Sequence, residues 1–197
     1  MKRNSIAVVA GALAVLAVLA AAGCKSKAPV YKDDPRSKVV GAEGVARPEW
    51  MNGPPKTEDF YYAVGNGRAG MSGAAQQSTA RSDAQAKVAQ WKAAVVADTV
   101  KNYMEESGVP GNTQILVNFQ QATITRSTTN IAGFDEVEHW IDQDGVYHGL
   151  YRYPKKNLEN DFKASVSDFQ RNQSAAFAEF KAQEAYRYLE AQLDKHE

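Results

Sequence analysis

Acidic and histidine side chains gather in one stretch of the chain, and these are the residue types best suited to metal binding or acid–base chemistry. Carboxylates and imidazoles bind divalent metals and transfer protons near neutral pH. The stretch contains Asp135, Glu136, Glu138, His139, Asp142, Asp144 and His148. Their spacing fits neither an EF-hand loop nor a zinc motif, and the solvated face of a hairpin also requires alternating polar residues. We therefore expect no metal and no catalytic residue here, with His139 packed or hydrogen-bonded between Val137 and Ile141.

A glycine-rich segment is the second candidate. Gly65-Asn-Gly67-Arg-Ala-Gly70 matches G-x-G-x-x-G directly after a predicted strand. A dinucleotide site also needs a second, parallel strand that ends in an acidic residue. Polar, Thr-rich sequence follows instead, so we expect glycines that let the chain turn from strand into helix, and no cofactor or small-molecule substrate. The serines lack a G-x-S-x-G context, so serine hydrolase chemistry is not predicted.

Cys24 is the only cysteine in the chain. Two positive residues, Lys2 and Arg3, come first, an apolar run follows, and small residues lead directly into the cysteine. This layout predicts an export signal over residues 1–23, although a membrane anchor or a secretory signal with a free thiol are alternatives.

The cysteine after the predicted cleavage point resembles a bacterial lipoprotein lipobox. The resemblance implies that Cys24 carries a diacylglycerol and that the new amino terminus is acylated, typically with palmitate. Lys25 follows the cysteine, where an aspartate would imply retention in the inner membrane. We therefore expect an outer-membrane lipoprotein that faces the periplasm. Each buried CH₂ of the acyl chains contributes roughly 0.8 kcal/mol to attachment.

Composition excludes several classes of function. Removal of residues 1–23 takes away Lys2 and Arg3 and no acidic residue, so the formal net charge falls from 0 to −2. A chain this close to neutral gives no electrostatic reason to expect nucleic-acid binding. With Cys24 acylated, no thiol remains for a disulfide, a metal site or a nucleophile. The remaining length suits one domain with a modest core.

The elements that position the polar residues begin after a predicted tether. Residues 24–55 contain five prolines, several charges and little periodicity, which predicts a Pro-rich tether. As a coil its ends would lie about 30 Å apart. Trp50 and Met51 are the residues of this segment that could dock onto the membrane surface. We expect the small α+β domain to occupy residues 56–154.

A strand and a long helix open this domain. Residues 59–65 are aromatic and β-branched and end at glycines, which predicts a strand. The helix that follows could be capped by Ser82-Asp83 or start earlier, near Gln76, and it ends before Gly108. Its apolar stripe recurs at three- and four-residue steps. The stripe consists of Ala84, Val88, Trp91, Val95, Val96, Thr99, Val100 and Tyr103.

The rest of the domain contains one ambiguous segment and a hairpin. Within residues 112–133, apolar positions fit a helix, whereas the Thr-rich end favours a strand by propensity, and we expect a helix. Residues 134–142 and 146–153 predict a hairpin because Asp142-Gln-Asp-Gly145 supplies turn chemistry. On its two strands we expect Val137, His139 and Ile141 to share one face. Val146, His148 and Leu150 are expected to share one as well.

Residues 155–197 predict a long C-terminal helical extension, because they contain neither glycine nor proline and are rich in helix formers. An interrupted apolar stripe runs along it: Phe162, Val166, Phe169, Phe177, Phe180, Leu189 and Leu193. Such a helix is too long for the small domain to cover. Its surplus face predicts an interface with another copy or an envelope partner, or alternatively a solvated helix that frays.

Five short motifs resemble the Lpp-twenty family of small outer-membrane lipoproteins, which includes flagellar members. They are Arg47-Pro48-Glu49-Trp50, the segment 60–67, the Ala-rich helix around 80–86, a strand with Trp140, and Asp144-Gly145-Val-Tyr147-His-Gly-Leu150. The resemblance covers about residues 46–154. It implies an α+β fold in which a long helix packs on a small antiparallel sheet in the order strand–helix–strand–strand. This agrees with the elements predicted above.

The same resemblance implies a non-enzymatic role, and only Cys24 transfers as a functional residue. We therefore expect an outer-membrane lipoprotein with a periplasmic structural or assembly domain, associated with the envelope or a flagellar motor, as a homo-oligomer or with an envelope partner. A tethered regulator of a cell-wall synthase is the alternative. A periplasmic metal protein or enzyme would rest on the acidic and histidine cluster alone.

Overall fold

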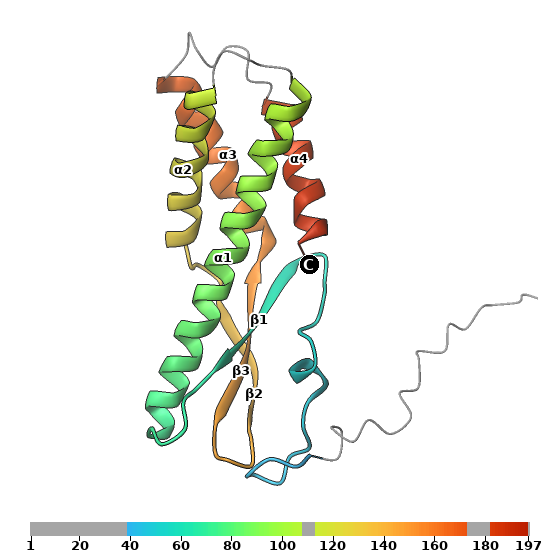
Figure 1. The fold of residues 1–197 in the computed structure, drawn as a ribbon, viewed down its shortest axis with the longest axis vertical. Coiled ribbons are helices and arrows are strands. Elements are labelled where there is room, and N and C mark those ends of the chain that lie inside the picture. The colour runs from blue at the N-terminus through green and yellow to red at the C-terminus, as the bar shows by residue number, and fades with distance from the viewer. Residues whose placement is uncertain (1–38, 108–112, 173–181, 197) are drawn as a thin grey trace, which may run out of the picture. The chain divides into compact units, whose positions relative to one another are not determined.

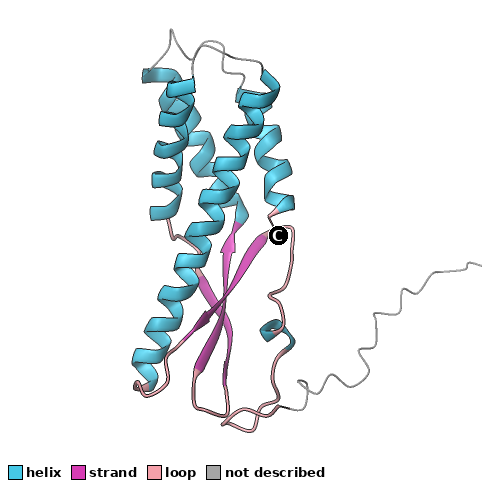
Figure 2. Cartoon of the chain, viewed as in Figure 1, coloured by secondary structure: helices cyan, strands magenta, loops and turns pink. Residues whose placement is uncertain are grey.

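The computed structural model describes residues 39–107, 113–172 and 182–196, and all statements below are confined to them. In chain order the elements are the 3-10 helix η2 (Glu49–Met51), β1 (Phe60–Asn66), α1 (Gly73–Ser107), α2 (Thr113–Thr129), β2 (Asp135–Ile141), β3 (Tyr147–Pro154), α3 (Lys155–Asn172) and α4 (Ala182–Lys195). Figure 1 labels the helices and strands and Figure 2 colours them by type. The α+β fold class is confirmed, with strand, helix and hairpin in the expected order.

The three strands form one antiparallel sheet in the order β1-β3-β2, so β1 and β2 are its edges. The predicted hairpin joins β2 to β3, and Gly145 supplies the positive φ of 74° that its turn requires. The β2–β3 register shifts between Glu136 and Glu138. The central strand β3 has buried side chains on both of its faces, which indicates that both faces of the sheet are covered.

Helix α1 covers one face of the sheet and then continues beyond it into a bundle with the other helices (Figure 1). Its first half lies unusually close to β1, because a Cβ added to Gly65 would be 1.9 Å from the backbone oxygen of Ala80. All eight residues of the predicted α1 stripe are buried. The helix starts at Gly73, earlier than Ser82-Asp83, and it ends at Ser107 as expected.

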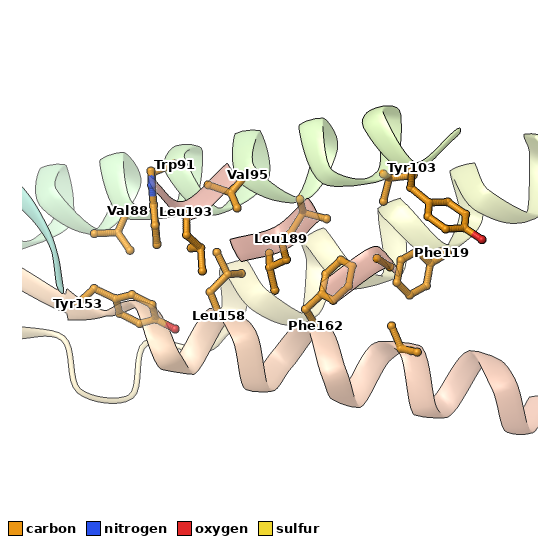
Figure 3. Close-up of a cluster of buried hydrophobic side chains, with 14 of the residues drawn as sticks. Val88, Trp91, Val95, Tyr103, Phe119, Tyr153, Leu158, Phe162, Leu189 and Leu193 are labelled. Atoms are coloured by element: carbon orange, nitrogen blue, oxygen red, sulfur yellow. The ribbon is translucent and has the colours of Figure 1, made fainter. Parts of the chain in front are cut away.

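The second half of α1 forms the core of the helical bundle. Its apolar side chains and those of α3 and α4, including Val95, Leu158, Leu189 and Leu193, point toward one another in Figure 3. Phe119 of α2 joins this cluster. The ambiguous segment is therefore a helix, as predicted. None of the described helices combines the length and the apolar character that crossing a membrane requires.

The C-terminal segment differs from the expected long helix with an uncovered face. It contains two described helices, and α4 packs against α1 while α3 packs against α2. Ala185, Leu189 and Leu193 are 5% exposed or less in the shared core, so burial of the α4 stripe accounts for this arrangement. The aromatic residues Phe177 and Phe180 of the predicted stripe lie outside the described residues.

Part of the predicted tether is folded. Trp50, Trp140 and Leu150 form a second apolar cluster on the sheet face opposite α1, and Val39 and Met51 pack against it. The indole N–H of Trp140 donates to the carbonyl of Val45 at 3.0 Å. Burial of Trp50 outweighs the extended tendency of the surrounding prolines, so residues 39–51 form the cover of this face. Cys24 and the predicted signal lie outside the described residues.

Candidate functional site

The acidic and histidine residues of the hairpin do not form one site. Asp135, Glu138 and Asp144 are exposed, and no group of three potential ligands among residues 39–107, 113–172 and 182–196 could hold a metal ion. His139, expected to be packed or hydrogen-bonded between Val137 and Ile141, is 48% exposed. Its ring stacks on that of Tyr147 with the centres 5.1 Å apart, and its Nδ1 lies 3.5 Å from Oε1 of Glu136. The contacts of His139 are with Glu136 and Tyr147 rather than with Val137, because the register shift leaves Val137 half exposed. The buried residue of β2 is Trp140, on the opposite face.

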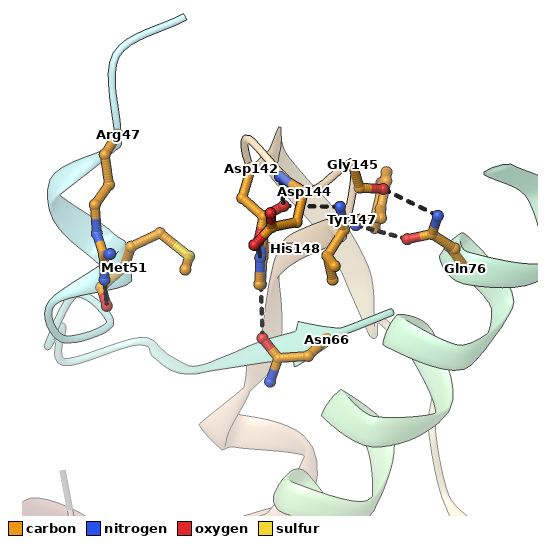
Figure 4. A network of polar contacts seen from close by, with 10 residues as sticks. Arg47, Met51, Asn66, Gln76, Asp142, Asp144, Gly145, Tyr147 and His148 are labelled. Carbon is orange, nitrogen blue, oxygen red and sulfur yellow. Dashed lines mark hydrogen bonds and ion pairs between the residues drawn. The ribbon is translucent and has the colours of Figure 1, made fainter. Parts of the chain in front are cut away.

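His148 and Asp142 instead hold the hairpin turn (Figure 4). The two ring nitrogens of His148 lie 2.8 Å from Oδ1 of Asn66 and 3.1 Å from Oδ2 of Asp142. The other oxygen of Asp142 accepts the backbone N–H groups of Asp144 and Val146. Although desolvation opposes it, these hydrogen bonds, led by that from His148, lower the pKa of Asp142. The arrangement stabilises a turn and leaves no free group for chemistry.

Gln76 connects the same turn to α1 (Figure 4). Its amide donates to the carbonyls of Gly145 at 3.0 Å and Met71 at 3.2 Å, and its Oε1 accepts the N–H of Tyr147 at 2.8 Å. The side chain is buried. A lone glutamine in a helical segment carries no sequence signal for this role. The sequence therefore indicated Gln76 only as a possible start of the helix.

The glycine-rich segment has the structural role that its sequence context predicted. Gly65 allows β1 to approach α1, and Gly70 has a φ of 78° in the connection between them. The strand before the glycines pairs antiparallel with β3, whereas a dinucleotide fold requires a parallel βαβ unit.

Lys92 is a buried amine that sequence analysis did not single out. It is 1% exposed, and its Nζ donates to the carbonyls of Ser127 at 2.9 Å and Asn130 at 2.5 Å. The ammonium also lies 3.7 Å from the centre of the Tyr153 ring. Burial lowers the pKa of Lys92 to about 8, although Asp161 opposes this. Because these carbonyls lie at the C-terminal end of α2, Lys92 fastens α2 to α1 and is too enclosed to meet a ligand.

The remaining candidate is a groove of about 490 Å³ along the free edge of β1. Its walls come from β1, from α1, from Pro54 and from His196 after α4. The Tyr61 and Trp91 rings, which are stacked with their centres 4.4 Å apart, form part of the wall. The indole nitrogen of Trp91 is buried and has no hydrogen-bond partner in the part of the chain that the structure describes.

The direction of the backbone groups of β1 determines which of them face the groove. Gly67 donates to the carbonyl of Tyr147, and Lys155 donates to the carbonyl of Asp59. Backbone groups alternate in direction along a strand, so residues 59, 61, 63, 65 and 67 face β3. The N–H and C=O groups of Phe60, Tyr62, Val64 and Asn66 must therefore face the groove.

Side chains satisfy these outward groups at both ends of the strand. Thr57 accepts the N–H of Phe60 and donates to its carbonyl, both at 3.2 Å. At the other end Asp83 accepts the N–H of Asn66 at 3.0 Å, and Lys87 donates to the carbonyl of Val64 at 2.6 Å.

The middle of the edge is open. Among the described residues, no hydrogen bond reaches the N–H or the C=O of Tyr62 or the N–H of Val64. Edge strands with unpaired backbone groups are templates for pairing with another strand. This arrangement can bind an extended backbone. The groove is also lined by Lys87 and His196, which are held by carboxylates: Lys87 lies 2.9 Å from Asp83, and His196 lies 2.8 Å from Asp98.

Comparison with known proteins adds no relative from which a role could be transferred: no family model, no curated protein and no solved structure matches the chain.

Proposed function

We propose that this protein is an outer-membrane lipoprotein, anchored through acylated Cys24, whose periplasmic domain is a non-enzymatic assembly module that docks through the edge of β1. The open backbone groups of Tyr62 and Val64 carry this proposal. Native sheets usually protect their edges with charges, prolines or a covering element. Here side chains protect both ends of β1 and leave its centre free, which supports a docking role for this edge.

The chemistry of the described residues agrees with a role in assembly. Among the described residues, the polar hairpin side chains are exposed, hold the turn or, in the case of Glu136, accept the hydroxyl of Tyr147, and the buried amine of Lys92 is enclosed. The resemblance to Lpp-twenty lipoproteins supports the same class of function, including the envelope or flagellar association. The tethered regulator of a cell-wall synthase gains no support, because residues 39–51 pack on the sheet. Residues 24–38, if fully extended, would span at most about 54 Å.

A photo-crosslinking amino acid at Tyr62 in growing cells tests the docking role. The matched control carries the same amino acid at Gln121, an exposed position on α2. We expect a covalent adduct from position 62 and none from position 121. Equal yields from both positions would contradict docking at β1.

The anchor is tested separately by Cys24→Ser. We expect this variant to leave the outer-membrane fraction, because an acyl anchor supplies most of the membrane affinity. Retention of the variant in the outer-membrane fraction would contradict lipid attachment at Cys24.

A further inference from the structure

We propose that the groove is filled by β1 of a second copy of this chain. The two β1 strands pair antiparallel about a two-fold axis that passes beside Ala63, and they join two three-stranded sheets into one of six strands. This inference rests on the proposed function and names the partner of the docking edge. Three features support pairing with a second copy. They are the open hydrogen-bonding groups of β1, the positions of the side chains that cap its ends, and the charges beyond those ends.

The open groups of β1 complement those of a second copy. In this register Tyr62 lies opposite the second copy's Val64. Each such pair exchanges two backbone hydrogen bonds, as in any hydrogen-bonded antiparallel pair. The N–H of Tyr62 donates to the partner's Val64, and the N–H of that Val64 donates to the carbonyl of Tyr62. The two-fold axis doubles this to about four bonds. The carbonyl of Val64 can keep its bond from Lys87, because a carbonyl oxygen has two lone pairs.

The side chains that cap β1 disfavour the neighbouring registers. If Tyr62 lay opposite its own copy, Val64 would face Phe60, whose N–H and C=O are bound by Thr57. If Val64 lay opposite its own copy, Tyr62 would face Asn66, whose N–H is bound by Asp83. Of these three registers, only the one centred on Ala63 pairs the open groups of Tyr62 with those of Val64.

Charges beyond the strand ends select the same register. Arg68 is exposed, as are the acidic residues Glu58 and Asp59. Centring on Ala63 places Arg68 opposite the second copy's Glu58, with Asp59 adjacent, once on each side of the axis. Centring on Tyr62 would instead place Arg68 opposite Lys56, a repulsive pair. Opposite charges directly across a strand pair are favourable, and like charges are unfavourable.

Helix α1 lines the groove and therefore approaches its own copy in the dimer. The residues of α1 on this side are Lys87, Gln90 and Ala94. Gln90 is exposed and Ala94 is small, so this side of the helix offers few bulky groups to obstruct a neighbouring helix. The dimer is isologous, as most homodimers are.

Cysteine crosslinking in intact cells tests the register. The full chain carries Glu58→Cys together with Arg68→Cys, and mild oxidation is followed by electrophoresis without reductant. Within one copy these positions lie beyond opposite ends of β1, and an extended chain between them spans about 33 Å, so they cannot pair with each other. We expect a covalent dimer at least tenfold more abundant than in either single variant. Lys56→Cys with Arg68→Cys is the matched control for the register centred on Tyr62.

A second pair of variants tests whether the backbone makes the contact. Tyr62→Pro removes an N–H that faces away from β3, so the sheet should form while the crosslink is lost. Tyr62→Phe keeps the N–H and should keep the crosslink. If Tyr62→Pro loses its helical circular dichroism, Val64→Pro replaces it, because that N–H also faces the groove.

The outcomes separate this inference from the function on which it rests. Equal amounts of covalent dimer in the double and single cysteine variants would overturn pairing with a second copy. A crosslink that survives Tyr62→Pro in a folded protein would overturn it as well. If the double variant gives no dimer while the probe at Tyr62 captures another protein, the second copy is overturned and docking at β1 stands. If neither the cysteine pair nor the photo-crosslinking amino acid at Tyr62 gives a covalent product, both the second copy and docking at β1 are overturned.

Discussion

Lys92 allows a quantitative prediction about stability and pH. Its folded pKa of about 8 lies below the ordinary value of 10.5, so between these values the unfolded chain binds more protons than the folded one. Stability then rises with pH through this window. One pKa unit corresponds to about 1.4 kcal/mol, and integration from pH 7 to pH 9.5 gives a gain of roughly 2 kcal/mol. The neutral amine can still donate to both carbonyls.

The comparison with Lys92→Met isolates this contribution. Methionine keeps the length of the side chain but leaves the carbonyls of Ser127 and Asn130 without their donor, so we expect the variant to be less stable at pH 7 by about 2 kcal/mol. Its deficit relative to the wild type should grow by roughly 2 kcal/mol at pH 9.5, since only the wild type gains stability there. The raised pKa values of Tyr147, Tyr151 and Tyr153 act in both proteins and cancel.

Urea unfolding of both proteins, followed by circular dichroism at the two pH values, measures this difference. A deficit that stays constant or shrinks as the pH rises would refute the reasoning. It would mean that Lys92 is not desolvated in the folded state, or that its ammonium is stabilised there as well as in water.

Three further substitutions have expected outcomes. Gly65→Ala should lower the free energy of unfolding by more than about 2 kcal/mol, because the new Cβ would meet the Ala80 backbone. Trp50→Ala should cost about 3 kcal/mol and expose residues 39–55 to limited proteolysis, since it empties the second apolar cluster. His148→Leu should flatten the acid dependence of stability below about pH 4. Asp142, whose lowered folded pKa contributes stability that is lost as the pH falls, depends largely on His148.

Each of these substitutions has a matched control. Gly53→Ala, where an added Cβ meets nothing within 4 Å, should leave the melting temperature unchanged, and equal losses at positions 53 and 65 would contradict the close approach. Val45→Ala, at a position 52% exposed, should not increase proteolysis. For His148→Leu, an acid unfolding midpoint and slope identical to those of the wild type would contradict its role. His139→Leu serves as the exposed comparison.

The sequence predicted those elements whose signals are local. The hairpin followed from Asp142 to Gly145, and the stripe of α1 from apolar periodicity, because turn chemistry and a buried helix face leave direct traces in the residue order. The Thr-rich end of α2 was ambiguous for a physical reason. In the helix Thr128 donates to the carbonyl of Ile124 and Thr129 to that of Thr125, which satisfies hydroxyls that propensity assigns to a strand.

Features that depend on distant contacts were not predictable in the same way. Nothing near Trp50 indicates that it packs on Trp140, so the prolines around it dominated the prediction of a tether. No glycine or proline marks the boundary between α3 and α4, and only the packing of Leu189 against α1 shows that the stripe belongs to the core. The open edge of β1 also depends on contacts distant in sequence, since Asp83 and Lys87 of α1 help to define it.

The 35 residues of α1 make the helix about 52 Å long, and this length has a mechanical consequence. One half of the helix is packed on the sheet and the other half in the bundle, with no break between them. A force applied to β1 can pass into the bundle along the continuous backbone hydrogen bonds of α1, as well as through β3, which runs directly into α3. Bending the sheet away from the bundle would require α1 itself to buckle. The sheet and the bundle therefore respond to load as one stiff body.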